Sequence, residues 1–373
     1  MEKKKKKATT LYLPSELINE ILLRLPVKSL ICFKSVCKSW FTLISDTNFA
    51  NSHFQIAATQ QTRSRILSIS GFPLQVRSID FQALLNDHSA SPNPNLSLPP
   101  SYLLLQIRGS CRGFIFLNCS VYNLLWNPST GFHKTIPLSP SCEKFDPYHF
   151  LHGFGYDHSR DDYLLVSLSC GPDLANDTSS HSEIFSLRDN TWKEIEDTRH
   201  LPYTYTTSGF EYPTATLGFL FNGALHWFVS RRRLSGMVIL AFDLMERKLL
   251  EIPFPDGFFH YSKDMCLCVS GENLCLCAMR NGIVEIWVMR EYKVHSSWTK
   301  TLVFPIDGIP YFSAIYSTNN GDIIGTIRGT GLVKYNGKGQ LLGHCSYCND
   351  SRGSQVVMYT ESLLSLPGDS KEV

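Results

Sequence analysis

Between Leu13 and about Ala57 the apolar residues recur every three or four positions, which is the period of an amphipathic helix. The first run places five apolar residues on one helix face: Leu17, Ile18, Ile21, Leu22 and Leu25. Pro14 is tolerated in a first helical turn, and Pro26 ends this helix and can open the next. Further short helices are expected near residues 27–36, 37–44 and 48–56. The chain therefore begins with a small all-α region of three or four helices.

This helical region has more large apolar residues than a core of its size can hide. The following residues cannot all point inward at once: Leu11, Leu13, Pro14, Ile18, Leu25, Pro26, Val27 and Trp40. One interpretation is that their surface packs against a second domain of the same chain. The other is that it is a standing interface for a separate protein, since exposed apolar patches usually mark such sites. The residues alone leave both interpretations open.

After residue 60 the pattern changes to short β runs broken by Gly, Pro, Asn and Asp. A phrase then recurs: an apolar strand, a polar turn, and a second strand that ends in an apolar-proline or aromatic step. Its copies begin at Leu124, Ile184, Leu240, Ile286 and Leu332. A spacing of about 50 residues is the period of kelch-like propellers. We therefore predict an all-β propeller of roughly six to eight blades, with seven the favoured number, over a sandwich or a barrel.

Composition narrows the class of protein. Hydrophobic residues make up 43% and charged residues 18% of the chain, a globular balance that excludes a coiled coil, a collagen-like fibre and a chain disordered throughout. Apolar runs fall short of the roughly 18 residues that a membrane helix needs. The start lacks the apolar stretch of a secretory signal. We expect a cytoplasmic or nuclear protein, or both, with no membrane partner.

Charge is unevenly placed. The net charge is +2, and five positive charges lie in the run Lys3–Lys7. The rest of the chain is near neutral, which gives no electrostatic reason to expect a nucleic-acid partner. We interpret the lysine run as a solvated, disordered tail, and an import signal is the alternative.

The twelve cysteines are expected to be reduced, small and mostly buried, because the chain is long and shows no export signal. Two pairs flank a turn at residues 270–273. A two-residue loop there would place Cys268 opposite Cys275, and Cys266 opposite Cys277. Structural zinc usually takes thiolates from tighter knuckles, so we expect packing at this hairpin, no metal and no cofactor.

Catalytic signatures are missing from the sequence. It contains no nucleophile elbow, no P-loop and no dinucleotide-binding glycine pattern. The closest group of histidines is His149, His152 and His158, and without a paired nucleophile these are expected to be packing residues. The residues alone therefore identify no active site.

Residues 13–30, LPSELINEILLRLPVKSL, together with residues 33–40, FKSVCKSW, resemble an F-box. The resemblance implies a helical hook that binds the Skp-type adaptor of a cullin–RING ubiquitin ligase. Carried over position by position, it implies these contact or supporting residues: Leu13, Pro14, Leu17, Ile18, Ile21, Leu25, Pro26, Leu30, Phe33, Val36 and Trp40.

Most of the remaining chain resembles the kelch-like F-box-associated domain of plant F-box proteins. The residues that carry this resemblance are LWNPSTG at 125–131, GFGYD at 153–157, NGALHW at 222–227 and EIWVM at 285–289. The doubled glycine of the kelch signature is absent. The expected organisation is a disordered basic tail at 1–10, an F-box at 11–57, a propeller at 58–368 and a C-terminal tail at 369–373.

Together the two resemblances imply a non-catalytic substrate receptor of a Skp–cullin–F-box ligase, in which propeller loops recruit a target protein for ubiquitination. One candidate loop, Arg231, Arg232 and Arg233, would suit an acidic or phosphorylated target, and a solvated hairpin tip is the alternative. Aromatic loops at 203–212 and 258–261 are further candidates. A scaffold outside any ligase remains open, as does a propeller enzyme or a propeller that binds a glycan or a small molecule.

Overall fold

A computed structural model describes residues 13–60, 63–70, 74–81, 83, 96, 105–119, 121–142, 150–169, 181–196, 203–204, 217–231, 236–258, 264–306, 312–318, 321–327, 330–346 and 354–367. The helical region contains α1 (Ser15–Leu23), α2 (Val27–Phe33), α3 (Lys38–Ile44) and α4 (Thr47–Gln60). Pro14 and Pro26 cap the first two helices in extended conformations. The buried core of this region is Leu22, Leu23, Leu30, Ile44 and Phe49. The expectation of three or four helices is confirmed.

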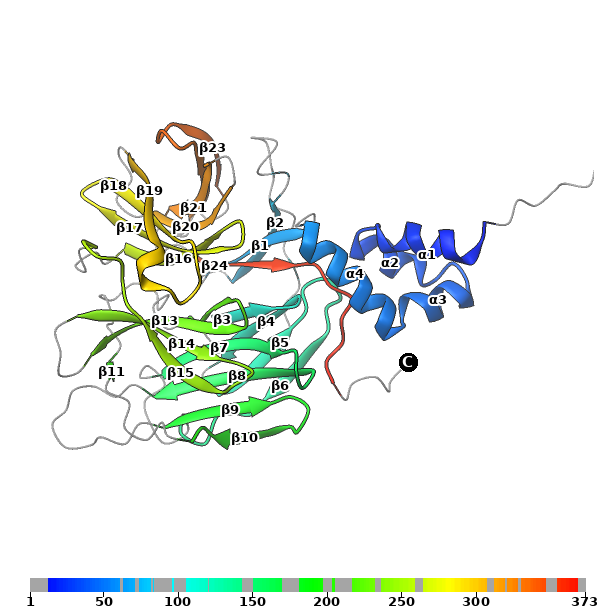
Figure 1. Cartoon of the computed structure of the whole chain (residues 1–373). Coiled ribbons are helices and arrows are strands. Elements are labelled where there is room, and N and C mark those ends of the chain that lie inside the picture. Colours follow the sequence, from blue (N-terminus) through cyan, green and yellow to red (C-terminus); the bar gives the residue numbers. More distant parts are fainter. Residues whose placement is uncertain are drawn as a thin grey trace, which may run out of the picture.

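The rest of the described chain forms five β-sheets (Figure 1). One has the order β2 (Gln75–Asp80), β1 (Ser64–Ser70) and β24 (Ser354–Thr360). It joins the two ends of the β region, since Ser64 pairs with Thr360. The next two sheets are simple meanders: β3 (Gln106–Cys111), β4 (Phe114–Cys119), β5 (Tyr122–Trp126) and β6 (His133–Ile136), then β7 (Phe150–Asp157), β8 (Asp162–Ser169), β9 (Ser182–Ser186) and β10 (Thr191–Glu194).

The fourth sheet contains β11 (Tyr203–Thr204), β12 (Phe219–Phe221), β13 (Ala224–Arg231), β14 (Met237–Asp243) and β15 (Lys248–Ile252). The fifth has eight strands: β16 (Asp264–Ser270), β17 (Asn273–Arg280), β18 (Ile283–Met289), β19 (Trp298–Pro305), β20 (Phe312–Ser317), β21 (Ile323–Ile327), β22 (Gly331–Tyr335) and β23 (Leu341–Ser346), with a short 3₁₀ helix at His295–Ser297. It consists of two four-stranded meanders joined by a short parallel contact between β16 and β20.

The sheets meet through their inner strands, as expected for a propeller. β24 lies beside β3, β3 beside β7, and β7 beside β13. The all-β propeller is confirmed, but the described strands do not fix the number of blades, so seven blades stays a prediction. Apolar side chains fill the layers between neighbouring sheets, and one such layer contains Leu151, Leu164, Trp227 and Leu240.

Glycines of the GFGYD segment allow two sheets to approach closely. A Cβ on Gly153 would lie 2.7 Å from Leu225 Cδ1 and 2.9 Å from a ring carbon of Trp227. The indole of Trp227 donates a hydrogen bond to the carbonyl of His152 at 2.9 Å. The segments 153–157 and 222–227 therefore form one packing unit between β7 and β13.

The cysteine hairpin has the predicted register. Cys268 pairs with Cys275 and Cys266 with Cys277 across β16 and β17, and Gly271 in the turn has a φ of 59°. Three of the four thiols are buried in an apolar cluster with Phe304 and Phe312. The neighbouring thiol of Cys275 and burial raise the pKa of Cys268 well above its usual value. Protonated thiols pack as small apolar groups. No cluster of potential metal ligands occurs within the described ranges.

Candidate functional site

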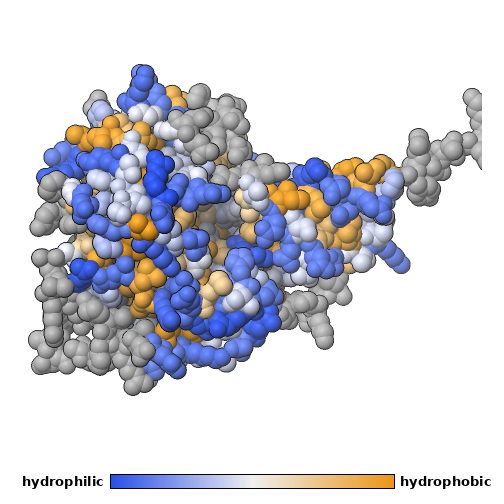
Figure 2. All heavy atoms as spheres, viewed as in Figure 1, coloured by the Kyte–Doolittle hydropathy of each residue, from blue (hydrophilic) through white to orange (hydrophobic). Residues whose placement is uncertain are grey.

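Six large apolar side chains of the helical region are exposed to solvent. They are 37% to 60% exposed and lie on or beside α1, α2 and α3: Leu13, Leu17, Ile21, Ile31, Val36 and Phe41. We call this set the apolar surface. Figure 2 shows hydrophobic residues gathered along the helical region on the face turned to the viewer. Patches of this kind mark protein interaction sites.

The local sequence explains why α1 has two apolar faces. Leu22 and Leu23 enter the helical core, whereas Leu17 and Ile21, four residues apart, lie one above the other on the outer face. Glu20 and Arg24 form an exposed ion pair of 2.7 Å, one turn apart. Such a pair contributes little to stability. It keeps the edge of the apolar surface polar.

The structure separates the predicted contact residues into two groups. Leu13, Pro14, Leu17, Ile21, Pro26 and Val36 are exposed. Ile18, Leu25, Phe33 and Trp40 are half-buried against the helical core, and the rings of Phe33 and Trp40 lie 5.4 Å apart. Leu30 is completely buried. Leu30 therefore belongs to the helical core, the second group has both buried and exposed surface, and the first group is the most open to a partner.

Two exposed residues were missed by the sequence analysis: Ile31 and Phe41. Each follows a residue that was selected, Leu30 or Trp40. Adjacent positions on a helix point about 100° apart, so both members of such a pair cannot enter one core. That geometry was the available signal.

The stretch of chain that contributes the second half of the apolar surface is basic. Between residues 21 and 45 the sequence contains Arg24, Lys28, Lys34 and Lys38 and no Asp or Glu. The Lys34 ammonium lies 6.0 Å from the centre of the Phe41 ring, and partial burial lowers its pKa. A partner for this surface should therefore combine an apolar groove with carboxylates at its edge.

The candidate target-binding residues of the propeller are mostly engaged or lie outside the described residues. Arg231 ends β13 and forms an ion pair with Glu251 of β15. Tyr203 donates a hydrogen bond of 2.6 Å to the same carboxylate. The hydrogen-bonded Arg231 lowers the pKa of Glu251. Arg232, Arg233 and most of both aromatic loops lie outside the described ranges, and Phe258 is buried.

Among the described residues, His152 and His158 of the predicted histidine group have no nucleophile beside them in a catalytic arrangement. His152 is buried, and burial holds its pKa well below its ordinary value. His158 is exposed, and its ring lies 4.8 Å from the Tyr156 ring. His149 lies outside the described residues. His152 is therefore a packing residue, as predicted.

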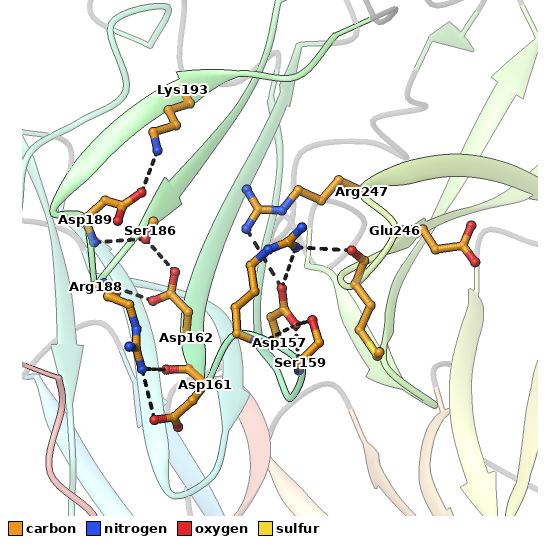
Figure 3. A network of polar contacts seen from close by, with 12 residues as sticks. Asp157, Ser159, Asp161, Asp162, Ser186, Arg188, Asp189, Lys193, Glu246 and Arg247 are labelled. Carbon is orange, nitrogen blue, oxygen red and sulfur yellow. Dashed lines mark hydrogen bonds and ion pairs between the residues drawn. The ribbon is translucent and has the colours of Figure 1, made fainter.

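A polar network links three turns at the propeller end nearer the helices (Figure 3). The buried carboxylate of Asp157 accepts hydrogen bonds from Ser159 and from Arg160, whose guanidinium is 3.0 Å away. Arg160 also donates to the carbonyl of Met245 in the next sheet. Nearby, Asp162 accepts a hydrogen bond from Ser186. The polar groups of these turns are hydrogen-bonded to one another, and Arg160 connects two neighbouring sheets. The network therefore holds the sheets together and is not an open binding site.

A cavity of about 190 Å³ lies where β1 begins and where β3 and β24 end. Its lining includes the side chains of Ser64, Ser110, Arg112 and Thr360. The hydroxyl of Ser110 already donates to the carbonyl of Met358 at 2.6 Å. The cavity brings together no nucleophile and base, and it is small compared with ligand sites of roughly 300 Å³ or more.

The described residues contain no helix long and apolar enough to cross a membrane.

Comparison with known proteins agrees with this architecture. Residues 11–51 match the F-box domain, and residues 61–323 match the F-box associated beta propeller domain. The F-box/kelch-repeat protein At3g23880 of Arabidopsis thaliana is 30% identical over 346 residues, which cover 87% of each chain. The F-box protein CPR1 of the same plant is 27% identical, over 97% of this chain and 91% of its own. The chain belongs to the plant F-box proteins that carry an F-box associated beta propeller domain.

Proposed function

We propose that this chain is the substrate-recognition subunit of a Skp–cullin–F-box ubiquitin ligase. The apolar surface on α1–α3 binds the Skp-type adaptor, and the propeller holds the target protein. One observation carries the proposal: six large apolar side chains on or beside α1–α3 are exposed, whereas α4 packs against the propeller. The helical region therefore has an interface left for a separate partner after its own domain is packed.

The chemistry of the surface fits this role. Fully burying one Leu or Ile side chain contributes about 1.5–3 kcal/mol. Leu17 and Ile21 lie one turn apart on the exposed face of α1, where a partner can surround them and exclude water. The basic residues around α2 and α3 add orientation and speed of association more than affinity.

The mechanism is a gain in effective concentration. This chain performs no bond-making step. By holding the adaptor at one end and the target at the other, it converts the meeting of ligase and target into an event within one complex. The propeller supports this role because rigid strands can position variable loops.

The strand directions favour one end of the propeller for the target. β3 and β24 run toward α4 and end beside it, at Arg112 and Glu361. β13 begins next to Asp243, on the same side as the turn at Met245, so its other end, at Arg231, faces away from the helices. We place the target on this far end, where it does not compete with the adaptor for space.

The test is a calorimetric titration of a Skp-type adaptor into the full chain. The double substitution Leu17→Asp with Ile21→Asp should weaken binding at least 100-fold, because it buries charges in an apolar contact. The melting temperature should hardly change, since both side chains are exposed in the free chain. The matched control is Leu341→Asp on β23, 55% exposed in the wild type, which should bind like the wild type. Unchanged affinity in the double variant would refute the proposal.

A further inference from the structure

The helical region and the propeller share one hydrophobic core. Ala50 and Phe54 of α4 lie in the same buried cluster as Phe114 and Phe154 of the sheets. The segment after β24, residues 361–366, which we call the C-terminal strap, enters this cluster through Leu364 and Leu366. Figure 1 shows α4 lying between β24 and the other three helices.

The C-terminal strap also reaches the helical core. Leu363 packs against the cluster that contains Leu22, Leu30 and Phe49. Leu363 is half-buried and also packs against the shared cluster, in which the next residue, Leu364, is buried. A change of angle between the two domains would therefore separate the C-terminal strap from one of the two clusters.

The C-terminal strap is itself anchored on the propeller. The buried amide of Asn127 donates hydrogen bonds to the carbonyls of Ser362, at 3.0 Å, and Leu364, at 3.5 Å. Gly113 lies so close to the strap that a Cβ there would be 2.2 Å from Ser362 Cβ. The C-terminal strap therefore cannot move away from the propeller without losing its contacts with the turn at Gly113 and the turn at Asn127.

Arg112 forms a second connection. It occupies the β3–β4 turn with a φ of 49°, and its guanidinium lies 5.3 Å from the centre of the Phe54 ring and 4.1 Å from that of Tyr156. It donates to Asn51 Oδ1 at 2.7 Å and to the hydroxyl of Tyr163 at 3.3 Å. One side chain thus contacts α4 through Asn51 and Phe54, and the propeller through two tyrosines. Planar stacking of this kind is directional.

Arg63, between α4 and β1, completes the junction. Its guanidinium donates to the carbonyl of Leu23, the last residue of α1, at 2.9 Å, and to that of His53 at 3.2 Å. Its own carbonyl accepts from the amide of Glu361 at 3.0 Å. The end of α1, α4 and the C-terminal strap are therefore joined at one buried residue.

We propose that Arg112 and Leu363 are positioning residues that fix the F-box and the propeller as one rigid body. Domains joined through a linker usually move relative to each other unless their interface is large and apolar. Here a shared core, a strap and two arginines oppose that motion. Resting on the proposed function, this inference adds that the adaptor is held at one distance and direction from the propeller, which sets the effective concentration of a bound target.

The test measures the distance between two spin labels, placed through noncanonical amino acids at Lys38 of α3 and Lys248 of β15, both exposed. The wild-type chain should give one narrow distance distribution. The double substitution Arg112→Ser with Leu363→Ser should widen it at least twofold, and Leu363→Met alone should keep it narrow. The control Lys300→Ser removes a partly exposed pair with Glu285 in the fifth sheet, away from the junction residues, and should also leave it narrow.

Adaptor affinity is measured on the same variants. It should stay within about threefold of the wild type, because the apolar surface is untouched. Where the double variant fails to fold, Asn127→Ala replaces it, since it removes the anchor of the strap and only one further hydrogen bond, from the amide of Ser129. A broad wild-type distribution, or a narrow one in the loosened variants, would overturn the inference. If the wild-type chain did not bind the adaptor, the proposed function would be wrong. The distance distribution would still decide whether the two domains form one rigid body.

Discussion

At the scale of the residue, buried histidines show how the fold selects a protonation state. His226 is fully buried, with Nδ1 3.0 Å from the carbonyl of Phe219 and Nε2 2.8 Å from the Tyr292 hydroxyl. A carbonyl only accepts, so Nδ1 carries the proton and Tyr292 donates to Nε2. Burial lowers the pKa of His226 to about 4, although its hydrogen bonds to backbone oppose this shift. The neutral form is part of the fold.

This protonation state predicts a loss of stability in acid. The pKa of His226 is lower in the folded chain than in the unfolded one, so its contribution is complete above pH 6.5 and is lost as the pH falls toward 4. At pH 5 the loss is about 2 kcal/mol for this one group. Thermal unfolding at pH 7 and pH 5 measures it.

The substitution His226→Gln should reduce the fall in melting temperature between the two pH values. His158→Gln, at an exposed position, is the control and should keep the wild-type fall. An equal fall in wild type and His226→Gln would show that this histidine titrates alike in both states. His53 and His152, whose pKa values burial also lowers, add to the wild-type effect.

Residue patterns predicted the helical region well and its surface only in part. The period of three and four predicted α1, but of the five residues assigned to one face Leu22 is buried, whereas Leu17 and Ile21 are exposed. The F-box motif does not tell contact from support, so it left the buried Leu30 in one set with exposed residues such as Leu13. Ile31 and Phe41 were missed for the same reason. Which member of an adjacent apolar pair points outward depends on the neighbouring helices, and a period read along one helix cannot show that.

At the scale of the element, local patterns predicted the register of a strand pair better than the length of a helix. The hairpin of β16 and β17 has the predicted register because a two-residue turn fixes which cysteines face each other. Helix α4 was expected near residues 48–56 and runs from Thr47 to Gln60. Its Phe49 enters the helical core, while Phe54 enters the propeller core. Packing of α4 against the helical core on one face and the propeller on the other stabilises its extra residues, and the local sequence contains no signal for this packing.

The turns between strands also connect neighbouring sheets, and we predict that Asp157 stabilises one such connection. The substitution Asp157→Asn should lower the stability of the chain by about 2 kcal/mol, because hydrogen bonds to a charged group contribute about 1.5–3 kcal/mol each. Its carboxylate accepts from Ser159 Oγ at 2.6 Å and from Arg160 at 3.0 Å. Those hydrogen bonds outweigh the effect of burial and lower its pKa, so this stabilisation persists at neutral pH and is lost only in strong acid.

Thermal unfolding of Asp157→Asn measures this effect, with Asp189→Asn as its control. Asp189 pairs with Lys193 on the same rim, but both side chains are about half exposed. Solvent screens such a pair, so its removal should leave the melting temperature nearly unchanged. Equal melting temperatures for the two variants would show that the buried network does not join the sheets energetically.

At the scale of the whole molecule, the sequence predicted the two domains but not how they are joined. The change from helical to strand pattern and the repeated phrase were enough for a helical start and a propeller. The junction depends on contacts between residues far apart in the chain, such as Asn127 with Ser362 and Arg63 with Glu361. Neither pair has a periodicity or a motif of its own, so pattern reading cannot find it.

We propose that the F-box end of this molecule recruits a ligase to a target protein held by the propeller. It is tested by purifying the tagged chain from plant cells in which the proteasome is inhibited, as wild type and as the double variant Leu17→Asp with Ile21→Asp. The wild type should retain a Skp-type adaptor and a cullin, and also a further protein that carries ubiquitin. The double variant should retain that further protein without ubiquitin and lose both ligase subunits. Retention of the cullin by the double variant, or equal ubiquitination of the further protein in both samples, would contradict the account.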